Sequence, residues 1–215
     1  MPVRTALLAG ASGLVGGHLL DQLLANPTWD RVVSIGRREV DRDDPRLEQR
    51  LVQLPGVGHL PRVDDVFCAL GTTIRKAGSQ EAFRVVDHDA VVALASAART
   101  AGTDTFLHVT AMGADPGSRL FYNRVKGETE RDVSNVGIAR TVAFRPSILD
   151  GERAESRPAE QAGLMMMRAV APLLGRYRPT RAVDVAAAMI NVALDEQADL
   201  SVLDAAAITQ WAAAT

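Results

Sequence analysis

The chain has 215 residues and a formal net charge of −2, from 24 Lys and Arg against 26 Asp and Glu. This length suits one domain with a full-sized core, so we expect residues 1–215 to form a single domain. The balanced charge offers no basic surface for a nucleic acid backbone, and nucleic acid is therefore excluded as an expected partner.

The first predicted strand, Arg4–Ala9, leads through a glycine-rich turn into a predicted helix over Leu14–Ala25. A secretory signal is the competing interpretation, which we reject because four glycines interrupt the apolar run. Glycines between a strand and a helix let free N–H groups of the helix face a pyrophosphate at close range, although such turns also close ordinary α/β units. The turn predicts nucleotide binding by Gly10, Ser12, Gly13, Leu14, Val15 and Gly16.

The second predicted strand, Arg31–Ile35, is followed by Gly36 and then by Arg37 and Arg38. NAD sites carry an acidic residue near this place, where it would repel a 2′-phosphate. Two guanidinium groups instead favour a phosphate through charge-assisted hydrogen bonds, so we predict NADP(H) rather than NAD(H). The alternative is a solvated pair that balances the acidic residues Asp41, Asp43 and Asp44.

Short apolar runs alternate with segments of helical period along the rest of the chain. The further predicted strands are Arg50–Leu54, Asp65–Leu70, Thr105–Thr110 and Ala139–Phe144, and the further predicted helices are Gln80–Ala101, Leu120–Val133, Glu160–Leu174 and Val183–Leu194. This alternation is typical of a parallel sheet covered on both faces. We predict an α/β fold with a Rossmann-type, doubly wound parallel sheet and a ligand crevice at the carboxyl ends of the strands.

Cysteine and histidine usage indicates neither a disulfide nor a metal. Cys68 is the only cysteine, and its apolar neighbours predict an inert, buried thiol. On this basis we expect a reducing, cytoplasmic location. The histidines have no metal-ligand spacing, so we predict no metal and interpret them as structural or surface residues: His18, His59, His88 and His108. No run approaches the roughly 18 apolar residues of a membrane span, so we expect no membrane partner.

Tyr122 and Lys126 lie four residues apart and share one face if the segment from Leu120 is helical. An ordinary tyrosine has a pKa of about 10, and a nearby ammonium lowers that pKa by favouring the phenolate. Lys126 can also hold a nicotinamide ribose. Thr110, at the end of a predicted strand, offers a hydroxyl that can orient a substrate carbonyl, and the alternative is a turn cap. We predict a catalytic set of Thr110, Tyr122 and Lys126, in which Tyr122 and Lys126 also contact the cofactor.

These features together resemble the short-chain dehydrogenase/reductases, and more narrowly their atypical Tat-interacting-protein-like branch. The resemblance covers most of the chain and is carried by Gly10, Gly13 and Gly16, Ile35 to Arg38, Cys68 to Thr73, Lys76 to Gly78, Met112 to Asp115, Tyr122 to Glu128, and Phe144 to Pro146. It implies a Rossmann-type fold, bound NADP(H) and the Thr-Tyr-Lys set. It also implies that Leu70, Gly71, Thr72 and Thr73 line the adenosine and phosphate side of the cofactor, and that Pro146 and Ile148 flank the nicotinamide.

Two departures accompany the resemblance. Extended members open the fourth helix with Val-Asn, whereas this chain has Val86-Asp87, and we leave Asp87 out of the catalytic set as a local cap or pair. The chain has Thr110-Ala111 where many members have serine.

Relatives that process nucleotide sugars build a substrate lobe after the sixth strand, whereas this chain has only Leu149 to Thr180 there before helix and sheet resume, so the resemblance makes a sugar nucleotide substrate less expected. We interpret residues 149–180 as a substrate-covering insertion whose possible lining residues are Arg153, Arg157, Met165, Met166, Met167 and Tyr177. At least one of the consecutive methionines is expected to pack in the core, since they point in different directions on a helix. Arg75 and Lys76 either reach an anionic group or are solvated loop charges.

The predicted function is an NADP(H)-dependent oxidoreductase that transfers hydride to or from a small carbonyl or alcohol substrate. The alternative is an NADPH-binding regulatory or redox-sensing protein with little turnover. The sequence leaves open the substrate, the reaction direction and the hydride face. It also leaves the oligomeric state open, although the Ala-rich helix Gln80–Ala101 would suit a homodimer.

Overall fold

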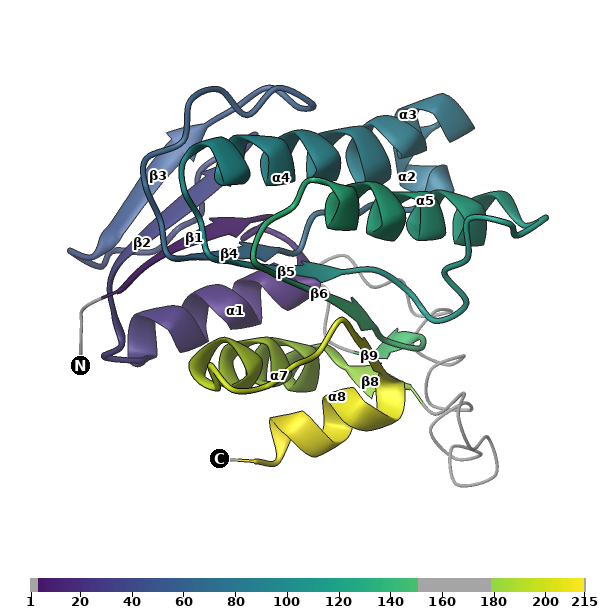
Figure 1. Ribbon diagram of the computed structural model, residues 1–215. Coiled ribbons are helices and arrows are strands. Elements are labelled where there is room, and N and C mark those ends of the chain that lie inside the picture. Colours follow the sequence, from purple (N-terminus) through teal and green to yellow (C-terminus); the bar gives the residue numbers. More distant parts are fainter. Residues whose placement is uncertain (1–3, 151–178, 215) are drawn as a thin grey trace, which may run out of the picture.

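A parallel sheet of seven strands forms the centre of the computed structural model, which describes residues 4–150 and 179–214 (Figure 1). The strands, in their order across the sheet, are β3 (Leu47–Leu51), β2 (Trp29–Gly36), β1 (Arg4–Ala9), β4 (Asp65–Cys68), β5 (Thr105–Val109), β6 (Arg140–Arg145) and β9 (Val202–Asp204). The order in which the strands are added to the sheet reverses between β1 and β4. In folds of this kind, ligands bind at the carboxyl ends of the two strands where that reversal occurs. The predicted doubly wound α/β fold is confirmed.

Helices cover both faces of this sheet (Figure 1). One face carries α1 (Leu14–Ala25), α7 (Ala182–Leu194) and α8 (Ala205–Ala212). The other face carries α2 (Ile74–Ala77), α3 (Gln80–Arg84), the π-helix η1 (Val85–Asp89), α4 (Ala90–Thr100) and α5 (Phe121–Asn135).

The core consists of two apolar layers, one on each face of the sheet. Alternate residues of β1 point into opposite layers: Leu8 packs with α1 and α7, whereas Leu7 packs with α4. Burial on both faces explains the nearly continuous apolar strands in the sequence. The small side chains Ala95 and Ala98 of α4 are fully buried in the second layer, so they serve helix-to-sheet packing within this chain.

Several elements differ from the sequence-based prediction. The third strand lies three residues earlier than expected, because β2 pairs with Leu47–Leu51 rather than with the following residues. The single helix expected over Gln80–Ala101 is divided by η1, whose wider turn has no distinctive apolar period. The strand β9 and the helix α8 were not predicted.

A second, two-stranded sheet joins the chain before and after the predicted insertion. In it, β7 (Leu149–Asp150) pairs in parallel with β8 (Thr180–Arg181). The Thr180 N–H donates to the Ile148 carbonyl at 2.9 Å, and the Thr180 hydroxyl oxygen accepts the Ser147 N–H at 3.1 Å. The predicted helix Glu160–Leu174 and the possible lining residues lie outside the described residues: Arg153, Arg157, Met165, Met166, Met167 and Tyr177.

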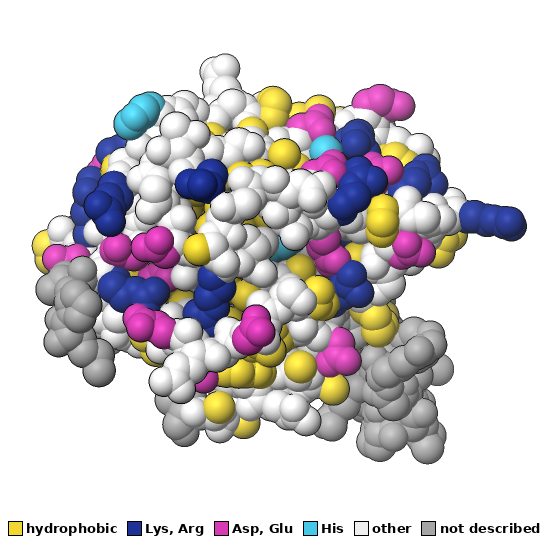
Figure 2. All heavy atoms as spheres, in the orientation of Figure 1, with side chains coloured by type: hydrophobic (Ala, Val, Ile, Leu, Met, Phe, Trp, Pro, Cys, Tyr) yellow, Lys and Arg dark blue, Asp and Glu magenta, His cyan; other side chains and the backbone are white. Residues whose placement is uncertain are grey.

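The molecular surface mixes charges of both signs. Figure 2 shows Lys and Arg interspersed with Asp and Glu over the face in view. Among the helices of residues 4–150 and 179–214, none has the length and apolarity needed to cross a bilayer. In the same residues, no group of three His, Cys, Asp or Glu is placed to hold a metal ion.

Candidate active site

The glycine-rich turn between β1 and α1 passes very close to the backbone that follows β4. Gly10 has a positive φ of 93°, and a Cβ there would lie 2.7 Å from the Ala69 carbonyl oxygen. A Cβ at Gly16 would lie 2.0 Å from the Gly10 carbonyl oxygen. No side chain caps the start of α1. The first N–H groups of α1 are therefore free to meet a phosphate at close range.

The other turn residues divide between surface and core. Ser12 and Gly13 are exposed and Leu14 is half-buried, so their backbone can face a ligand. Val15 is buried and packs in the core layer beside α7. We infer that Val15 supports the turn through packing, while its backbone belongs to the helix start.

Arg37 and Arg38 are exposed directly after β2, at the carboxyl end of the sheet. Neither forms an ion pair within the described part of the chain, where Asp44 instead pairs with Arg46. The alternative interpretation, a pair that balances nearby acidic residues, therefore has no contact to support it. Both guanidinium groups are available to an anionic ligand.

The loop after β4 brings the predicted cofactor-lining residues to the same edge. Leu70 is half-buried and Gly71 is exposed. The Thr72 N–H donates to Asp87 Oδ2 at 2.8 Å. The Thr73 hydroxyl accepts the Lys76 N–H at 3.1 Å and so caps α2, a structural use of this side chain. Arg75 and Lys76 are exposed on that short helix.

Tyr122 and Lys126 occupy successive turns of α5, as the spacing predicts. Tyr122 is 37% exposed, and its ring packs against Phe83 with 5.5 Å between centroids. Lys126 is only 4% exposed, and its Nζ lies 2.8 Å from Asp87 Oδ1. The pair thus combines an accessible phenol with a buried ammonium.

Burial and nearby charges shift the pKa values of Lys126 and of two neighbouring residues, Cys68 and His108. Burial, the largest single influence, lowers the pKa of Lys126, but the neighbouring Asp87, Tyr122 and Cys68 together raise it above its ordinary value, with Asp87 contributing most of the three. Burial raises the pKa of Cys68 to about 12, which confirms the predicted inert thiol. Burial, with a contribution from the Lys126 charge, lowers the pKa of His108 to about 3. Both Cys68 and His108 are therefore uncharged near pH 7.

Thr110 lies at the end of β5, but its hydroxyl does not face Tyr122. The hydroxyl donates to Glu130 Oε1 at 2.5 Å and lies 3.3 Å from the Phe144 carbonyl oxygen. Glu130 also forms an ion pair with Arg145. Because Glu130 is eight residues from Tyr122 on α5, the two lie about 12 Å apart along the helix axis. The contact of Thr110 with a substrate carbonyl stays a prediction.

The last two predicted cofactor contacts follow β6. Pro146 is buried, and its carbonyl accepts the Met112 N–H at 2.9 Å, which ties the β6 end to the loop after β5. Ile148 is 50% exposed and so can touch a ligand.

Asp87 is the residue that the sequence reasoning missed. Its side chain joins Lys126 to the loop after β4, although the sequence favoured only a local cap or pair. Its position in the sequence could have revealed this role, since Asp87 stands where extended members of the resembled family have the Asn of Val-Asn.

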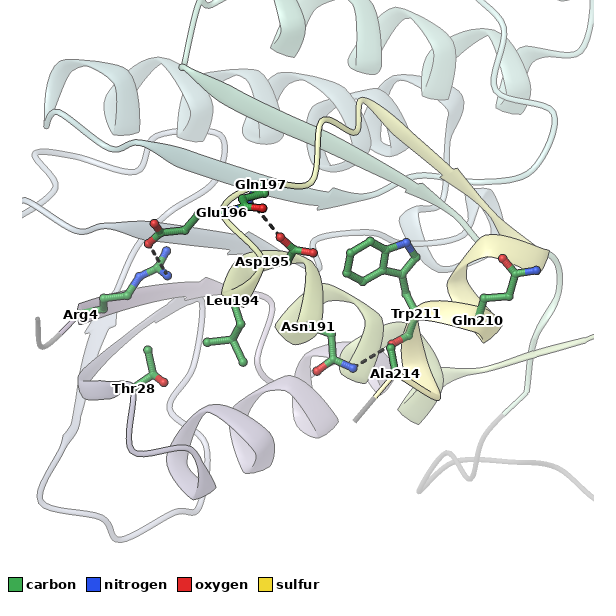
Figure 3. Close-up of a pocket in the computed structure, with 10 residues that line it drawn as sticks. All are labelled: Arg4, Thr28, Asn191, Leu194, Asp195, Glu196, Gln197, Gln210, Trp211 and Ala214. Carbon is green, nitrogen blue, oxygen red and sulfur yellow. Dashed lines mark hydrogen bonds and ion pairs between the residues drawn. The ribbon is translucent and has the colours of Figure 1, made fainter. Parts of the chain in front are cut away.

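A cavity of about 1080 Å³ lies near the amino ends of the central strands, whereas the candidate active site lies at their carboxyl ends (Figure 3). It is lined by Arg4, Thr28, Asn191, Leu194, Asp195, Glu196, Gln197, Gln210, Trp211 and Ala214. These residues lie at the amino ends of β1 and β2 and around the ends of α7 and α8. None of the predicted site residues lines this cavity, so it is separate from the candidate active site.

Comparison of the sequence with curated proteins identifies the family. No family model matches the chain. The mitochondrial protein fmp52 of Emericella nidulans is 38% identical over 163 residues, which cover 71% of this chain and 70% of that protein. The mitochondrial protein FMP52 of Coccidioides immitis is 30% identical over 212 residues, 89% of this chain and 86% of that protein.

The chain belongs to the Fmp52 family. This Fmp52-family assignment corrects one expectation. The curated relatives are named mitochondrial proteins, which contradicts the predicted cytoplasmic location. The error has a physical origin, because a single cysteine buried in β4 reflects core packing and carries no information about the compartment. The narrower Tat-interacting-protein-like assignment stays a prediction.

Solved structures share the fold of this Fmp52-family chain. MoeE5 in complex with UDP-glucose and NAD has a TM-score of 0.69 at 19% identity, covering 93% of this chain and 75% of MoeE5. ElxO with NADP bound has a TM-score of 0.71 at 10% identity, covering 97% of this chain and 100% of ElxO. At these identities the likeness establishes the Rossmann-type fold alone.

Proposed function

We propose that this Fmp52-family protein is an NADP(H)-dependent oxidoreductase of the short-chain dehydrogenase/reductase type. The observation that carries the proposal is the Tyr122–Lys126 pair on α5, placed beside the loop after β4 that also meets the glycine-rich turn. Solved structures of the same fold are described with NAD or NADP bound. A small carbonyl or alcohol is the proposed substrate class.

The residues present suit a dinucleotide. A Cβ at Gly10 or Gly16 would fill the space that the tight turn needs, and the open start of α1 offers N–H donors. Leu70, Gly71 and Thr72 would line the adenosine side, while Pro146 and Ile148 would border the nicotinamide. The nicotinamide, when bound, supplies or accepts the hydride.

The proposed chemistry of the chain itself is a proton transfer at Tyr122 Oη. During reduction Tyr122 gives its proton to the substrate oxygen, and during oxidation it takes the proton back. Lys126, one helix turn away, is the proposed positive charge beside this proton transfer. Lys126 would also hold the nicotinamide ribose. Thr110 is the proposed third member of the set, but to orient a carbonyl its hydroxyl must first leave Glu130.

The deciding experiment is NADPH binding by calorimetry, followed by an assay of NADPH loss across aldehydes, ketones and quinones. We expect Tyr122→Phe to bind NADPH normally and to consume it at least about 100-fold more slowly, because the ring and its Phe83 contact remain while the proton donor is lost. Binding without turnover on any compound would favour the regulatory alternative. Absence of nucleotide binding would overturn the proposal.

Cofactor preference is tested at Arg37. We expect Arg37→Asp to weaken NADPH binding at least tenfold and to leave NADH binding little changed, because the new carboxylate would repel only the 2′-phosphate. Arg62→Asp is the matched control, since Arg62 is an exposed arginine that precedes the amino end of β4, whereas Arg37 follows the carboxyl end of β2. An unchanged ratio of NADPH to NADH affinity in Arg37→Asp would contradict the assignment.

The role of Thr110 has its own test. A substrate-orienting hydroxyl predicts that Thr110→Val slows turnover and that Thr110→Ser restores it. A purely structural hydroxyl predicts that Thr110→Val lowers the melting temperature, through the loss of the Glu130 hydrogen bond, while turnover per folded molecule is unchanged.

A further inference from the structure

Asp87 is a buried acidic residue that contacts both the loop after β4 and the helix α5. The residue is 1% exposed. One carboxylate oxygen lies 2.8 Å from Lys126 Nζ, and the other accepts the Thr72 N–H at 2.8 Å. Its backbone carbonyl accepts the Thr129 hydroxyl at 2.9 Å. One residue thus connects the loop after β4 with two turns of α5.

The backbone around Asp87 is unusual. Asp87 lies within η1, the five-residue π-helical segment between α3 and α4. Such segments are rare and less favourable than a regular α-helix, and they occur frequently at functional sites. The neighbouring His88 bridges Asp89 and Asp132, so the segment is anchored to α5 on a second line of contacts. The wide turn is held where it presents Asp87 to Lys126.

The charge around Lys126 shows why a carboxylate matters there. The titratable groups that face Lys126 are Asp87 from η1, Tyr122 from α5, Cys68 from β4 and His108 from β5. Cys68 and His108 are uncharged near pH 7, and Tyr122 is the proposed proton donor. Within the described part of the chain, Asp87 therefore supplies the counter-charge of this buried ammonium. An amide of the same shape could accept the Thr72 N–H but could not supply that charge.

We propose that Asp87 is a positioning residue whose carboxylate holds the Lys126 ammonium in place beside the loop after β4 before any cofactor binds. This inference builds on the proposed function, because it assigns the partner that prepares Lys126 for the cofactor ribose and the phenol. Asp87 stands where extended members of the resembled family have the Asn of Val-Asn, and the sequence alone favoured only a local cap or pair for it.

The first test needs no cofactor. Thermal unfolding is measured from pH 6 to pH 9.5 for the wild type, Asp87→Asn, Lys126→Met and the double variant. We expect Asp87→Asn to lower the melting temperature by about 6–20 °C at pH 7, because it leaves a buried ammonium without its partner. The loss should shrink toward pH 9.5, since an unpaired, buried Lys126 has a depressed pKa and becomes neutral as the pH rises.

The double variant keeps the test decisive even if Asp87→Asn folds poorly. Removing the ammonium as well should restore stability, so Asp87→Asn/Lys126→Met should melt above Asp87→Asn. Asp104→Asn is the matched control, because Asp104 is an exposed aspartate in the loop before β5 and its substitution should change the melting temperature by only about 2 °C or less. A loss in Asp87→Asn that is equal at pH 6 and pH 9.5, or a double variant that is no more stable, would overturn the proposal.

A second measurement links the charge to turnover. In wild-type protein the rate of NADPH consumption should keep its alkaline limb above about pH 9, whereas in Asp87→Asn this limb should move down by at least one pH unit. Asp87→Glu should recover part of the wild-type profile. If the wild type binds no NADPH but the unfolding results hold, the proposed function fails while the role of Asp87 in holding Lys126 stands.

Discussion

Gly16 and Gly17 are neighbours in the first turns of α1, yet their surroundings differ sharply. A Cβ at Gly16 would lie 2.0 Å from the Gly10 carbonyl oxygen, whereas one at Gly17 would lie 3.8 Å from the nearest atom outside its own helix turn. We expect Gly16→Ala to cost about 3 kcal/mol in unfolding free energy and to weaken NADPH binding. We expect Gly17→Ala to stabilise the protein by up to about 1 kcal/mol. Urea unfolding of both variants checks this pair, and equal effects would contradict it.

The buried His108 makes stability depend on acid pH. Burial lowers its pKa in the folded protein to about 3, while the unfolded chain takes up a proton below about pH 6.5. Folding stability is therefore lost as the pH falls through this window, by about 2 kcal/mol between pH 7 and pH 5. We expect His108→Leu to lack this loss, as measured by urea unfolding at both pH values. The exposed His59 is the control, and His59→Gln should keep the wild-type dependence.

At the scale of single residues, the sequence predicts which side chains occupy the candidate site better than it predicts the direction in which each side chain points. Tyr122 and Lys126 share one face of α5, as their spacing indicates. The orientation of the Thr110 hydroxyl could not be read in the same way, because it depends on Glu130, twenty residues further along the chain. The partnership of Asp87 with Lys126 was hidden for the same reason, since it joins elements that meet only in the folded protein.

The close approach of the helix α5 to the loop after β5 requires a glycine at position 127. A Cβ at Gly127 would lie 2.3 Å from the Asp115 carbonyl carbon and 2.3 Å from Pro116 N, which are backbone atoms with little room to move. We expect Gly127→Ala to push the helix outward, to lower the melting temperature by at least about 6 °C and to slow turnover by displacing Tyr122. Ser134→Ala, at an exposed position of α5, should change neither quantity.

Helices and strands with a clear apolar pattern in the sequence were predictable, whereas short or partly exposed elements were not. The strand β1 and the helix α1 match their expected bounds, because a buried strand and a glycine turn define both ends. The edge strand β3 is at most half-buried, so burial leaves little pattern to fix its register. The three residues of β9 are too few to show an alternation, and η1 depends on its contacts with α5.

At the scale of the whole molecule, the C-terminal unit of β9 and α8 completes the core layer beside α7. Ile208 is fully buried there, whereas Val202 in the same unit is 42% exposed. We expect Ile208→Ala to lower the unfolding free energy by about 2–5 kcal/mol and Val202→Ala by less than about 1 kcal/mol. Chemical unfolding measures both, and a small effect of Ile208→Ala would mean that this unit is not part of the cooperative core.

The short pairing of β7 with β8 also has an evolutionary consequence. Because Leu149 pairs with Thr180 and Asp150 pairs with Arg181, the two described residues that flank positions 151–178 are held near each other. The entropic cost of closing a loop rises only with the logarithm of its length, by about 0.6 kcal/mol for each doubling. We therefore expect natural variants to differ in the length of the connection between β7 and β8 at little cost to the stability of the sheet.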